Sequence, residues 1–193
     1  MSRTSSPSAS SGRPAPAGVL GSARPTGHAG PGASIVCRPV ASAGELAEHL
    51  RVRRQIFVDA QGLFAGDDRD EHDDDPATIH VAGMVDGAIV GAVRLYPLGA
   101  PAPSGAWQGD RLAVIPQARA LQLGADLVRC AVSLAGAAGG HRMVALVQSQ
   151  NVRFFERLGW DRDGAPAMHH GIEHQPMAIR LSAGEAVSPP RAA

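Results

Sequence analysis

Residues 111–125 combine an arginine, a glycine and a helical apolar pattern in an order that could bind an anion. The run Leu112–Val114 is short and apolar and is soon followed by Pro116, which favours the end of a buried strand. From Leu123 onward the apolar residues recur at helical spacing. The first turn of a helix offers unpaired N–H groups and the positive end of the dipole, and phosphate is its usual occupant. The stretch therefore predicts either a phosphate-binding turn or an ordinary strand–helix connection.

The turn within this stretch carries three residues with a recognisable spacing, Arg119, Gln122 and Gly124. The spacing resembles the acyl-CoA-binding signature of the GNAT N-acetyltransferases, which reads Arg or Gln, two residues, Gly, one residue, then Gly or Ala. Arg119 and Gly124 match the first and last positions, whereas Gln122 replaces the usual middle glycine. A glycine lets pyrophosphate approach the backbone closely. The Cβ of a glutamine narrows that approach, although the side-chain amide could donate a hydrogen bond to phosphate.

Residues 150–160 resemble a second signature of the same family. In that signature an asparagine opens a short helix, and an aromatic–tyrosine pair precedes Leu-Gly-aromatic. The matching residues are Asn151, Phe154, Leu158, Gly159 and Trp160. Phe155 stands where the family often has the tyrosine that is assigned as the acid for the departing CoA thiolate. Because phenylalanine has no hydroxyl, the resemblance implies that this role is vacant or has moved.

The resemblance covers residues 34–181, and so the whole of the expected domain. It implies the GNAT acyl-CoA N-acyltransferase fold, an α+β, three-layer architecture with a central mixed, mostly antiparallel sheet flanked by helices. The sheet would be splayed between the strands ending near Val114 and Gln148, with pantetheine in the gap. The finer likeness is to the nitrogen-starvation N-acetyltransferase subfamily associated with nitrilase gene clusters, and it rests on residues 142–145, 147–160 and 174–177.

The ligand implied by the resemblance is acetyl-CoA, used as a cosubstrate, with no metal. The implied binding residues lie at the strand end, in the turn and at the start of the short helix: Leu112, Ala113, Val114, Arg119, Ala120, Leu121, Gln122, Leu123, Gly124, Ala125, Asn151, Phe154 and Phe155. Acetyl transfer also needs the thioester carbonyl polarised and the amine deprotonated. A main-chain N–H near Ala113 or Val114 would face the thioester oxygen.

Two residues are candidates for the catalytic base, Asp110 and His80. Asp110 precedes the signature strand, near where several family members have a glutamate. His80 lies in a predicted strand, and a hydrogen-bonded core histidine is its favoured alternative reading. The histidines at positions 169, 170 and 174 cluster around the last strand without a recognised zinc spacing, so we interpret them as candidate substrate-side groups. A water guided by the backbone could also accept the proton.

The elements that would position these residues follow from the apolar patterns. Asp86–Gly87 separates two β-rich runs and is a strong hairpin signal. The stretch 54–62 is similar to the first-helix region of GNAT proteins and of acyl-homoserine-lactone synthases, which share this architecture. The predicted strands are residues 34–40, 78–85, 88–96, 107–114, 143–148 and 174–181, and the predicted helices begin near residues 42, 123 and 151.

Two charged segments are expected at the surface. The first helix would bury an apolar stripe and leave Arg51, Arg53 and Arg54 on a solvated face. Residues 67–75 hold seven acids in nine positions without calcium-loop spacing. A solvated acidic loop is the simpler interpretation, and a rim that attracts a protonated amine is the functional alternative. The predicted apolar stripe consists of Leu46, Leu50 and Phe57.

Composition bounds the class of protein. The formal net charge is zero, which gives no case for nucleic acid or a membrane surface as partner, and no apolar run reaches the roughly 20 residues of a membrane span. Residues 1–33 are rich in Ser, Pro, Gly and Ala and are expected to be disordered, residues 34–181 to form one domain, and residues 182–193 a flexible tail. Two distant cysteines fit buried free thiols and a cytoplasmic protein.

The sequence thus predicts an acetyl-CoA-dependent N-acetyltransferase that acts on a small-molecule amine in a ternary complex, and it leaves a homodimer open. Two alternatives remain. The chain could be a non-catalytic acyl-CoA sensor, which the departures at Gln122 and Phe155 permit. It could also be an acyltransferase like the acyl-homoserine-lactone synthases, which the first-helix region suggests.

Overall fold

The structure is a computed structural model that describes residues 32–99 and 105–182 of the 193-residue chain. Its strands are β1 (Ile35–Pro39), β2 (Ile79–Val85), β3 (Ala88–Pro97), β4 (Ala106–Val114), β5 (Arg142–Gln148), β6 (Asp161–Arg162), β7 (Ala167–His169) and β8 (Ile172–Arg180). Its helices are α1 (Ala43–Arg54), the π-helix η1 (Gln55–Ala60), the 3₁₀ segments η2 (Glu71–Asp74), η3 (Pro116–Leu121) and η4 (Ser149–Asn151), α2 (Leu123–Ala137) and α3 (Val152–Arg157). The predictions for 1–33 and 182–193 fall almost entirely outside the described residues.

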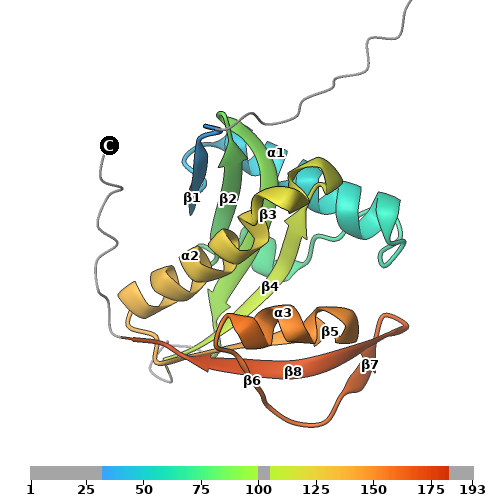
Figure 1. Ribbon diagram of the computed structural model, residues 1–193, viewed down its shortest axis with the longest axis vertical. Helices are drawn as coiled ribbons and strands as arrows, with labels where there is room; N and C mark the ends of the chain where they lie inside the picture. The colour runs from blue at the N-terminus through green and yellow to red at the C-terminus, as the bar shows by residue number, and fades with distance from the viewer. Residues whose placement is uncertain (1–31, 100–104, 183–193) are drawn as a thin grey trace, which may run out of the picture. The chain divides into compact units, whose positions relative to one another are not determined.

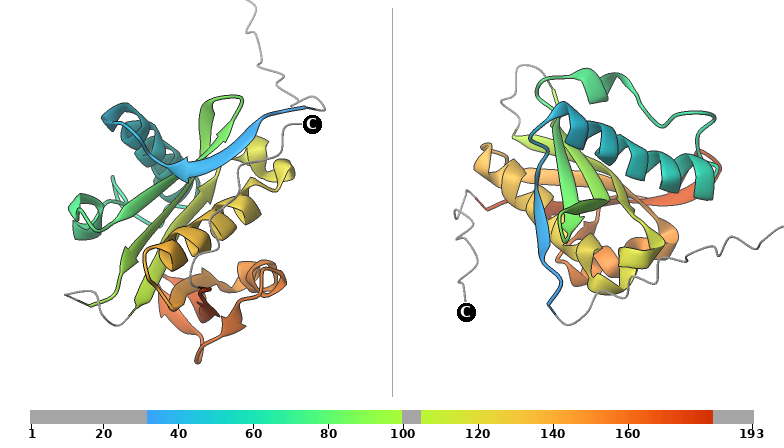
Figure 2. Two further views of the ribbon diagram at one scale, coloured as in Figure 1. Left: turned by 90° about the vertical axis from the view of Figure 1, so that its left-hand side faces the viewer. Right: turned by 90° about the horizontal axis from the view of Figure 1, so that it is seen from above.

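The strands form one mixed sheet in the order β1-β2-β3-β4-β5-β8-β6, with β7 paired to β8 (Figure 1). Neighbouring strands are antiparallel, except β4 and β5, which run parallel. α1 and α2 cover opposite faces of the sheet, as the two views in Figure 2 show. The predicted α+β architecture with a mixed, mostly antiparallel sheet flanked by helices is therefore confirmed.

The pairing of β4 with β5 is short. It joins residues 106–108 to residues 142–144, and beyond Gln108 and Val144 the two strands diverge (Figure 1). β4 continues to Val114 along β3, while β5 continues to Gln148 along β8. The sheet is therefore splayed between the strands ending at Val114 and Gln148, as predicted.

Local residue chemistry explains why the elements lie where they do. The Ser42 side chain caps α1 by accepting a hydrogen bond from the Glu45 N–H at 3.2 Å. Asp86 and Gly87 both have positive φ, 50° and 83°, which closes the predicted hairpin with a primed turn. α2 lies close to the sheet at Gly91, where an added Cβ would come within 2.8 Å of a Leu127 methyl.

The charged segments differ from their prediction. Arg53 is fully buried, so the expected solvated arginine face of α1 is wrong at this position. Its Nε donates to Asp68 Oδ2 at 2.8 Å, and its Nη atoms donate to the Asp73 carboxylate. Burial alone would raise the pKa of Asp73, but hydrogen bonds from Arg53 outweigh it and hold the pKa well below the usual range. The interpretation of residues 67–75 as a solvated loop is therefore wrong for Asp68 and Asp73.

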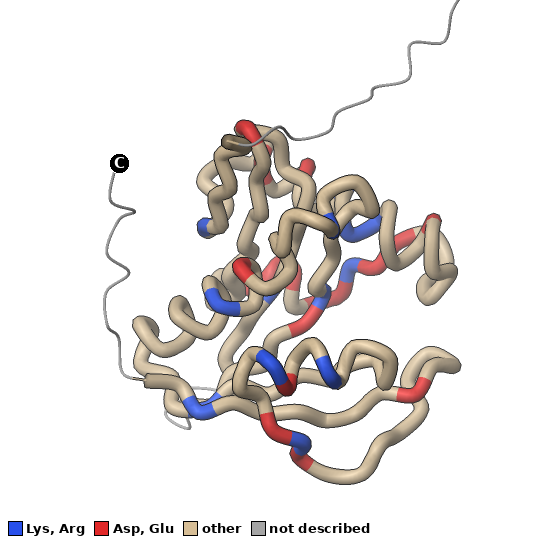
Figure 3. The backbone as a smooth tube through the Cα atoms, viewed as in Figure 1, with Lys and Arg blue, Asp and Glu red and all other residues tan. Residues whose placement is uncertain are grey.

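A second arginine fixes the same loop to the sheet. Arg94 of β3 is fully buried and donates to both oxygens of Asp70 at 2.6 and 2.8 Å, and to both oxygens of Asp110 at 2.9 and 2.7 Å. Arg111 adds hydrogen bonds to the Asp68 carbonyl and to Asp70 Oδ2. Basic positions of the adjoining strands accordingly lie next to acidic positions of the loop (Figure 3). We call these three arginines and four aspartates the ion network, and it anchors the acidic loop to the domain through Asp68, Asp70 and Asp73.

Candidate active site

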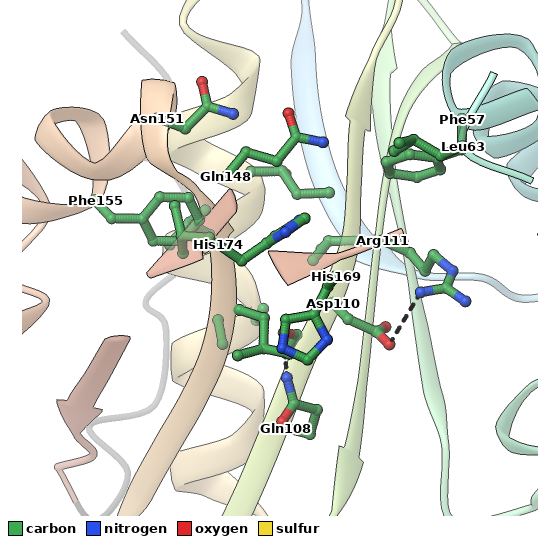
Figure 4. Close-up of a pocket in the computed structure, with 18 of the residues that line it drawn as sticks. Phe57, Leu63, Gln108, Asp110, Arg111, Gln148, Asn151, Phe155, His169 and His174 are labelled. Carbon is green, nitrogen blue, oxygen red and sulfur yellow. Dashed lines mark hydrogen bonds and ion pairs between the residues drawn. The ribbon is translucent and has the colours of Figure 1, made fainter. Parts of the chain in front are cut away.

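A cavity of about 340 Å³ lies in the splay between β4 and β5 (Figure 4). It reaches both faces of the sheet, because its lining comes from the α2–α3 side and from the α1 side. The α2–α3 wall is apolar and includes Leu112, Val128, Ala131, Ala145, Val147 and Phe155. The α1 wall is mixed and includes Phe57, Gln61, Phe64, Tyr96, Asp110, Arg111, His169, His170 and His174. A chain-like apolar group and a polar molecule could therefore meet from opposite sides.

Main-chain groups of β4 are turned into the gap. The Ile115 N–H donates to the Val90 carbonyl of β3 at 3.0 Å, and Ala113 pairs with Ala92 of the same strand. Because successive residues of a strand alternate in the direction of their backbone groups, the Val114 N–H points away from β3, towards the splay. The Val114 carbonyl on that side accepts from Arg119 Nε at 3.3 Å, which agrees with this direction.

The start of α2 lies beside the same strand end. Gln122 has φ 59° and ψ 12°, the left-handed conformation that favours glycine, which explains why glycine is usual here. The N–H groups of Leu123 and Gly124 begin α2 and so have no acceptor one turn earlier in the helix. A Cβ at Gly124 would lie 3.7 Å from Phe154 and 3.8 Å from Val114. The turn, α3 and the end of β4 are thus in contact.

The structure divides the predicted ligand residues into three groups. Asp110, Leu112, Asn151 and Phe155 line the cavity. Residues around the turn surround the α2 N-terminus next to it, and Arg119, Ala120 and Gln122 are exposed there. The side chains that instead pack in the core, leaving only their backbone for a ligand, are those of Ala113, Leu123 and Ala125.

The two candidate bases occupy different environments. Asp110 lines the cavity, but both of its oxygens accept hydrogen bonds from Arg94. His80 is buried outside the cavity lining, with its Nε2 3.3 Å from the Asp73 carbonyl oxygen and its ring 5.1 Å from that of His49. Burial lowers the pKa of His80. We therefore interpret His80 as a core histidine beside the ion network, in line with the alternative reading of the sequence.

Sequence reasoning missed Tyr96, the single tyrosine of the chain. It lies on β3 in the α1 wall, where His72 stacks on it with ring centroids 3.9 Å apart. Burial, followed by the charge of Asp110, raises its pKa to about 12. The only sequence signal was its place at the end of the predicted strand 88–96, and nothing local linked it to the signatures.

Two contacts cross the splay on the α1 side. Gln148 Nε2 donates to Gln61 Oε1 at 3.2 Å, joining the end of β5 to the residue after η1. The Phe64 ring lies 4.7 Å from that of His170 at the tip of the β7–β8 hairpin. These contacts narrow the polar mouth of the cavity.

Among the residues that the structure describes, neither a metal centre nor a membrane-spanning helix was found. Within residues 32–99 and 105–182, no group of three or more His, Cys, Asp or Glu side chains is placed to hold a metal ion. No helix in the same ranges is both long and apolar enough to cross a membrane.

Cys37 and Cys130 are free thiols, half-buried rather than fully buried, and burial raises the pKa of Cys37 to about 12.

The splayed sheet and its through-going cavity define the class of an acyltransferase. The chain belongs to the acetyltransferase (GNAT) family, because the family profile matches residues 46–160, more than half of its length. It is a GNAT acyltransferase that acts on acyl-CoA. No curated protein matches it.

Solved structures agree on the fold. An acyl-CoA N-acyltransferase from Pseudomonas aeruginosa is 21% identical, with 76% of this chain and 99% of that chain covered and a TM-score of 0.65. A putative N-acetyltransferase from Lactobacillus plantarum is 19% identical, with 77% of this chain and 98% of that chain covered and a TM-score of 0.65. BjaI, a CoA-dependent acyl-homoserine lactone synthase solved with SAM and isopentyl-CoA, is 20% identical. The match covers 78% of this chain and 84% of that chain, with a TM-score of 0.62. At these identities the likeness shows the fold alone.

Proposed function

We propose that the protein is an acetyl-CoA-dependent N-acetyltransferase that transfers the acetyl group to a small-molecule amine by direct attack in a ternary complex. The observation that carries this proposal is the cavity that reaches both faces of the sheet, with apolar residues on one side and polar residues on the other. Such a passage lets a thioester and an amine approach each other without a covalent enzyme intermediate.

The chemistry of the donor groups fits coenzyme A. The N–H groups that begin α2, together with the exposed Arg119, would bind pyrophosphate. The apolar wall would contact pantetheine, with Phe155 as a packing residue rather than an acid. The Val114 N–H would polarise the thioester carbonyl, and losing one such donor typically costs about 3 kcal/mol of transition-state stabilisation. Asp110, held by Arg94, would place negative charge beside the incoming ammonium.

The direct test has two stages. Titration calorimetry with acetyl-CoA measures binding, and a thiol-release assay with a panel of primary amines, including benzylamine, spermidine and L-lysine, measures turnover. We expect binding followed by amine-dependent release of CoA thiol. Binding without release for any amine would support the alternative of a non-catalytic acyl-CoA sensor. No binding would contradict both.

The acyl-homoserine-lactone synthase-like alternative draws on BjaI, which was solved with SAM and isopentyl-CoA. It predicts thiol release that requires S-adenosylmethionine and longer acyl chains, which the same assay measures with isopentyl-CoA. We favour acetyl transfer. We further propose that the protein belongs to the nitrogen-starvation subfamily, has a role in nitrogen metabolism, is located in the cytoplasm and forms a homodimer. Acceptor identification by mass spectrometry of the acetylated product tests the metabolic role.

A further inference from the structure

His174 occupies a special position at the splay. It lies on β8 directly opposite Gln148, the last residue of β5. Paired residues of neighbouring strands point to the same face, so His174 shares the α1 face with Gln148, whose side chain reaches Gln61. The His174 ring is half-buried and points into the cavity (Figure 4).

The backbone fixes which nitrogen of His174 can accept a proton. Its Nδ1 lies 2.9 Å from the carbonyl oxygen of Ile172. A carbonyl oxygen only accepts hydrogen bonds, so Nδ1 carries the hydrogen and Nε2 carries the lone pair. Nε2 has no hydrogen-bond partner among the described residues. The hairpin itself thus orients the imidazole and directs Nε2 towards the cavity.

The other titratable groups of the cavity are less suited to accept the proton of an ammonium. A proton on Asp110 would have to displace the two hydrogen bonds from Arg94. The ring of His169 packs edge-on to that of His174 at 5.7 Å, and the ring of His170 is engaged with Phe64. The titratable and charged groups that share the cavity with His174 are Tyr96, Asp110, Arg111, His169 and His170.

We propose that His174 is the general base of the acetyl transfer, an inference that rests on the proposed function. Nε2 takes one proton from the ammonium, directly or through one water. The amine nitrogen then forms a bond to the thioester carbon, the C–S bond breaks, and its electron pair leaves on sulfur. A second proton from the nitrogen passes to the thiolate, and His174 returns its proton to solvent. One amide, one thiol and one free proton result.

The test compares three variants in the thiol-release assay, with acetyl-CoA and the fastest amine of the panel. In His174→Gln, kcat should fall by about 10²- to 10⁴-fold while the Kd for acetyl-CoA stays within about twofold. The wild-type pH profile should rise through the range of about pH 5 to 8 in which histidines change charge, and the variant should lose this rise. Added imidazole should restore part of the activity of His174→Ala. His141→Gln, at the opposite end of β5, is the matched control and should behave as wild type.

Two results would overturn the inference while leaving the proposed function intact. One is a His174→Gln enzyme that keeps the wild-type pH profile and turnover. The other is an ¹⁵N NMR spectrum in which neutral His174 carries its hydrogen on Nε2, a measurement that needs no acceptor. Failure of the proposed function looks different, because wild-type protein would then release no thiol with any amine, and the base role would fall with it.

Discussion

The turn before α2, residues 114–125, and the acidic loop, residues 67–75, lie at the ends of the same strand, β4, or next to it, yet they are held in opposite ways. Arg119 of the turn is exposed and makes one long hydrogen bond to the backbone. Three of the loop's seven acidic residues, Asp68, Asp70 and Asp73, are instead bonded to Arg53 and Arg94, which are fully buried. The cation of the turn therefore stays accessible, whereas three carboxylates of the loop are bound within the fold.

The difference shows that the number of charges in a segment does not measure the charge available for binding. The ion network contains four aspartates and three arginines, so nearly all of its charge is neutralised internally. Only Asp110 and Arg111 of this network reach the cavity wall. The expected acidic rim for an amine is therefore reduced to one carboxylate next to a guanidinium.

The strongest test of this contrast is Arg94→Met. It removes a buried cation and leaves the carboxylates of Asp70 and Asp110 without their main partner. The free energy of unfolding should fall by about 3–5 kcal/mol, as expected for one half of a buried ion pair. Urea unfolding measures it, with the exposed Arg129→Met as a control that should stay within a few tenths of a kcal/mol. A loss below about 1 kcal/mol would show that the network does not hold the loop.

The converse experiment is Arg119→Ala. The Kd for acetyl-CoA should rise about 10- to 100-fold, because hydrogen bonds to charged groups contribute about 1.5–3 kcal/mol. The free energy of unfolding should stay nearly unchanged. Gly124→Val should also weaken binding, since its branched side chain would enter the space between α2, α3 and β4. Wild-type affinity in both variants would remove the turn from the ligand site.

Lowering the pH should reduce the free energy of unfolding through a buried histidine beside the ion network. Burial, followed by the charges of His80 and Arg53, lowers the pKa of His49 to about 3, and Asp73 also faces it. This pKa is depressed below the unfolded value of about 6.5, so the stabilisation is complete above that pH and is lost as pH falls towards 3. Between pH 7.5 and 5 the free energy of unfolding should drop by roughly 1–2 kcal/mol. Urea unfolding of wild type and two variants at both pH values measures this loss of free energy of unfolding. The loss should be smaller in His49→Gln and the same as in wild type in His141→Gln. An equal loss in all three proteins would exclude His49 as the cause.

The smallest effect is expected at the turn itself. Gln122→Gly removes the strain of a non-glycine residue in the left-handed conformation, but it also raises the conformational entropy of the unfolded chain. The free energy of unfolding should therefore rise by a net amount of about 0.5–1 kcal/mol. Gln117→Gly, in the right-handed 3₁₀ segment before it, should instead lose stability. Thermal unfolding of the pair decides the matter, and a shift of the same sign in both variants would contradict the assignment of strain to Gln122.

The sequence predicted what is encoded locally. The hairpin at Asp86–Gly87, the start of α2 and the splay between Val114 and Gln148 all rest on patterns within a dozen residues or on the family signatures. The short strands β6 and β7 and the π-helix η1 escaped, because two or three paired residues and a widened helical turn leave no periodic signal.

The ion network could not be read from local patterns. Arg53 is 15 residues from Asp68, and Arg111 is 43 residues from it. Whether an arginine is solvated or buried depends on partners that only the folded chain brings near. For the same reason Tyr96 and the tautomer of His174, which depend on the neighbouring strand and the hairpin turn, became visible only in three dimensions.

The parallel contact of β4 with β5 has a consequence for synthesis on the ribosome. β1 to β4 form a meander of sequence neighbours that can assemble as the chain emerges, while residues 142–180 are made after them. The cavity takes one wall from each part, and β8 brings His174 to it. A nascent chain that stops before β8 would leave the edge of β5 unpaired, open to non-native strand pairing. Acyl-CoA binding would therefore report that translation has passed β8, and a ligand present at that moment would favour the folded domain over aggregation.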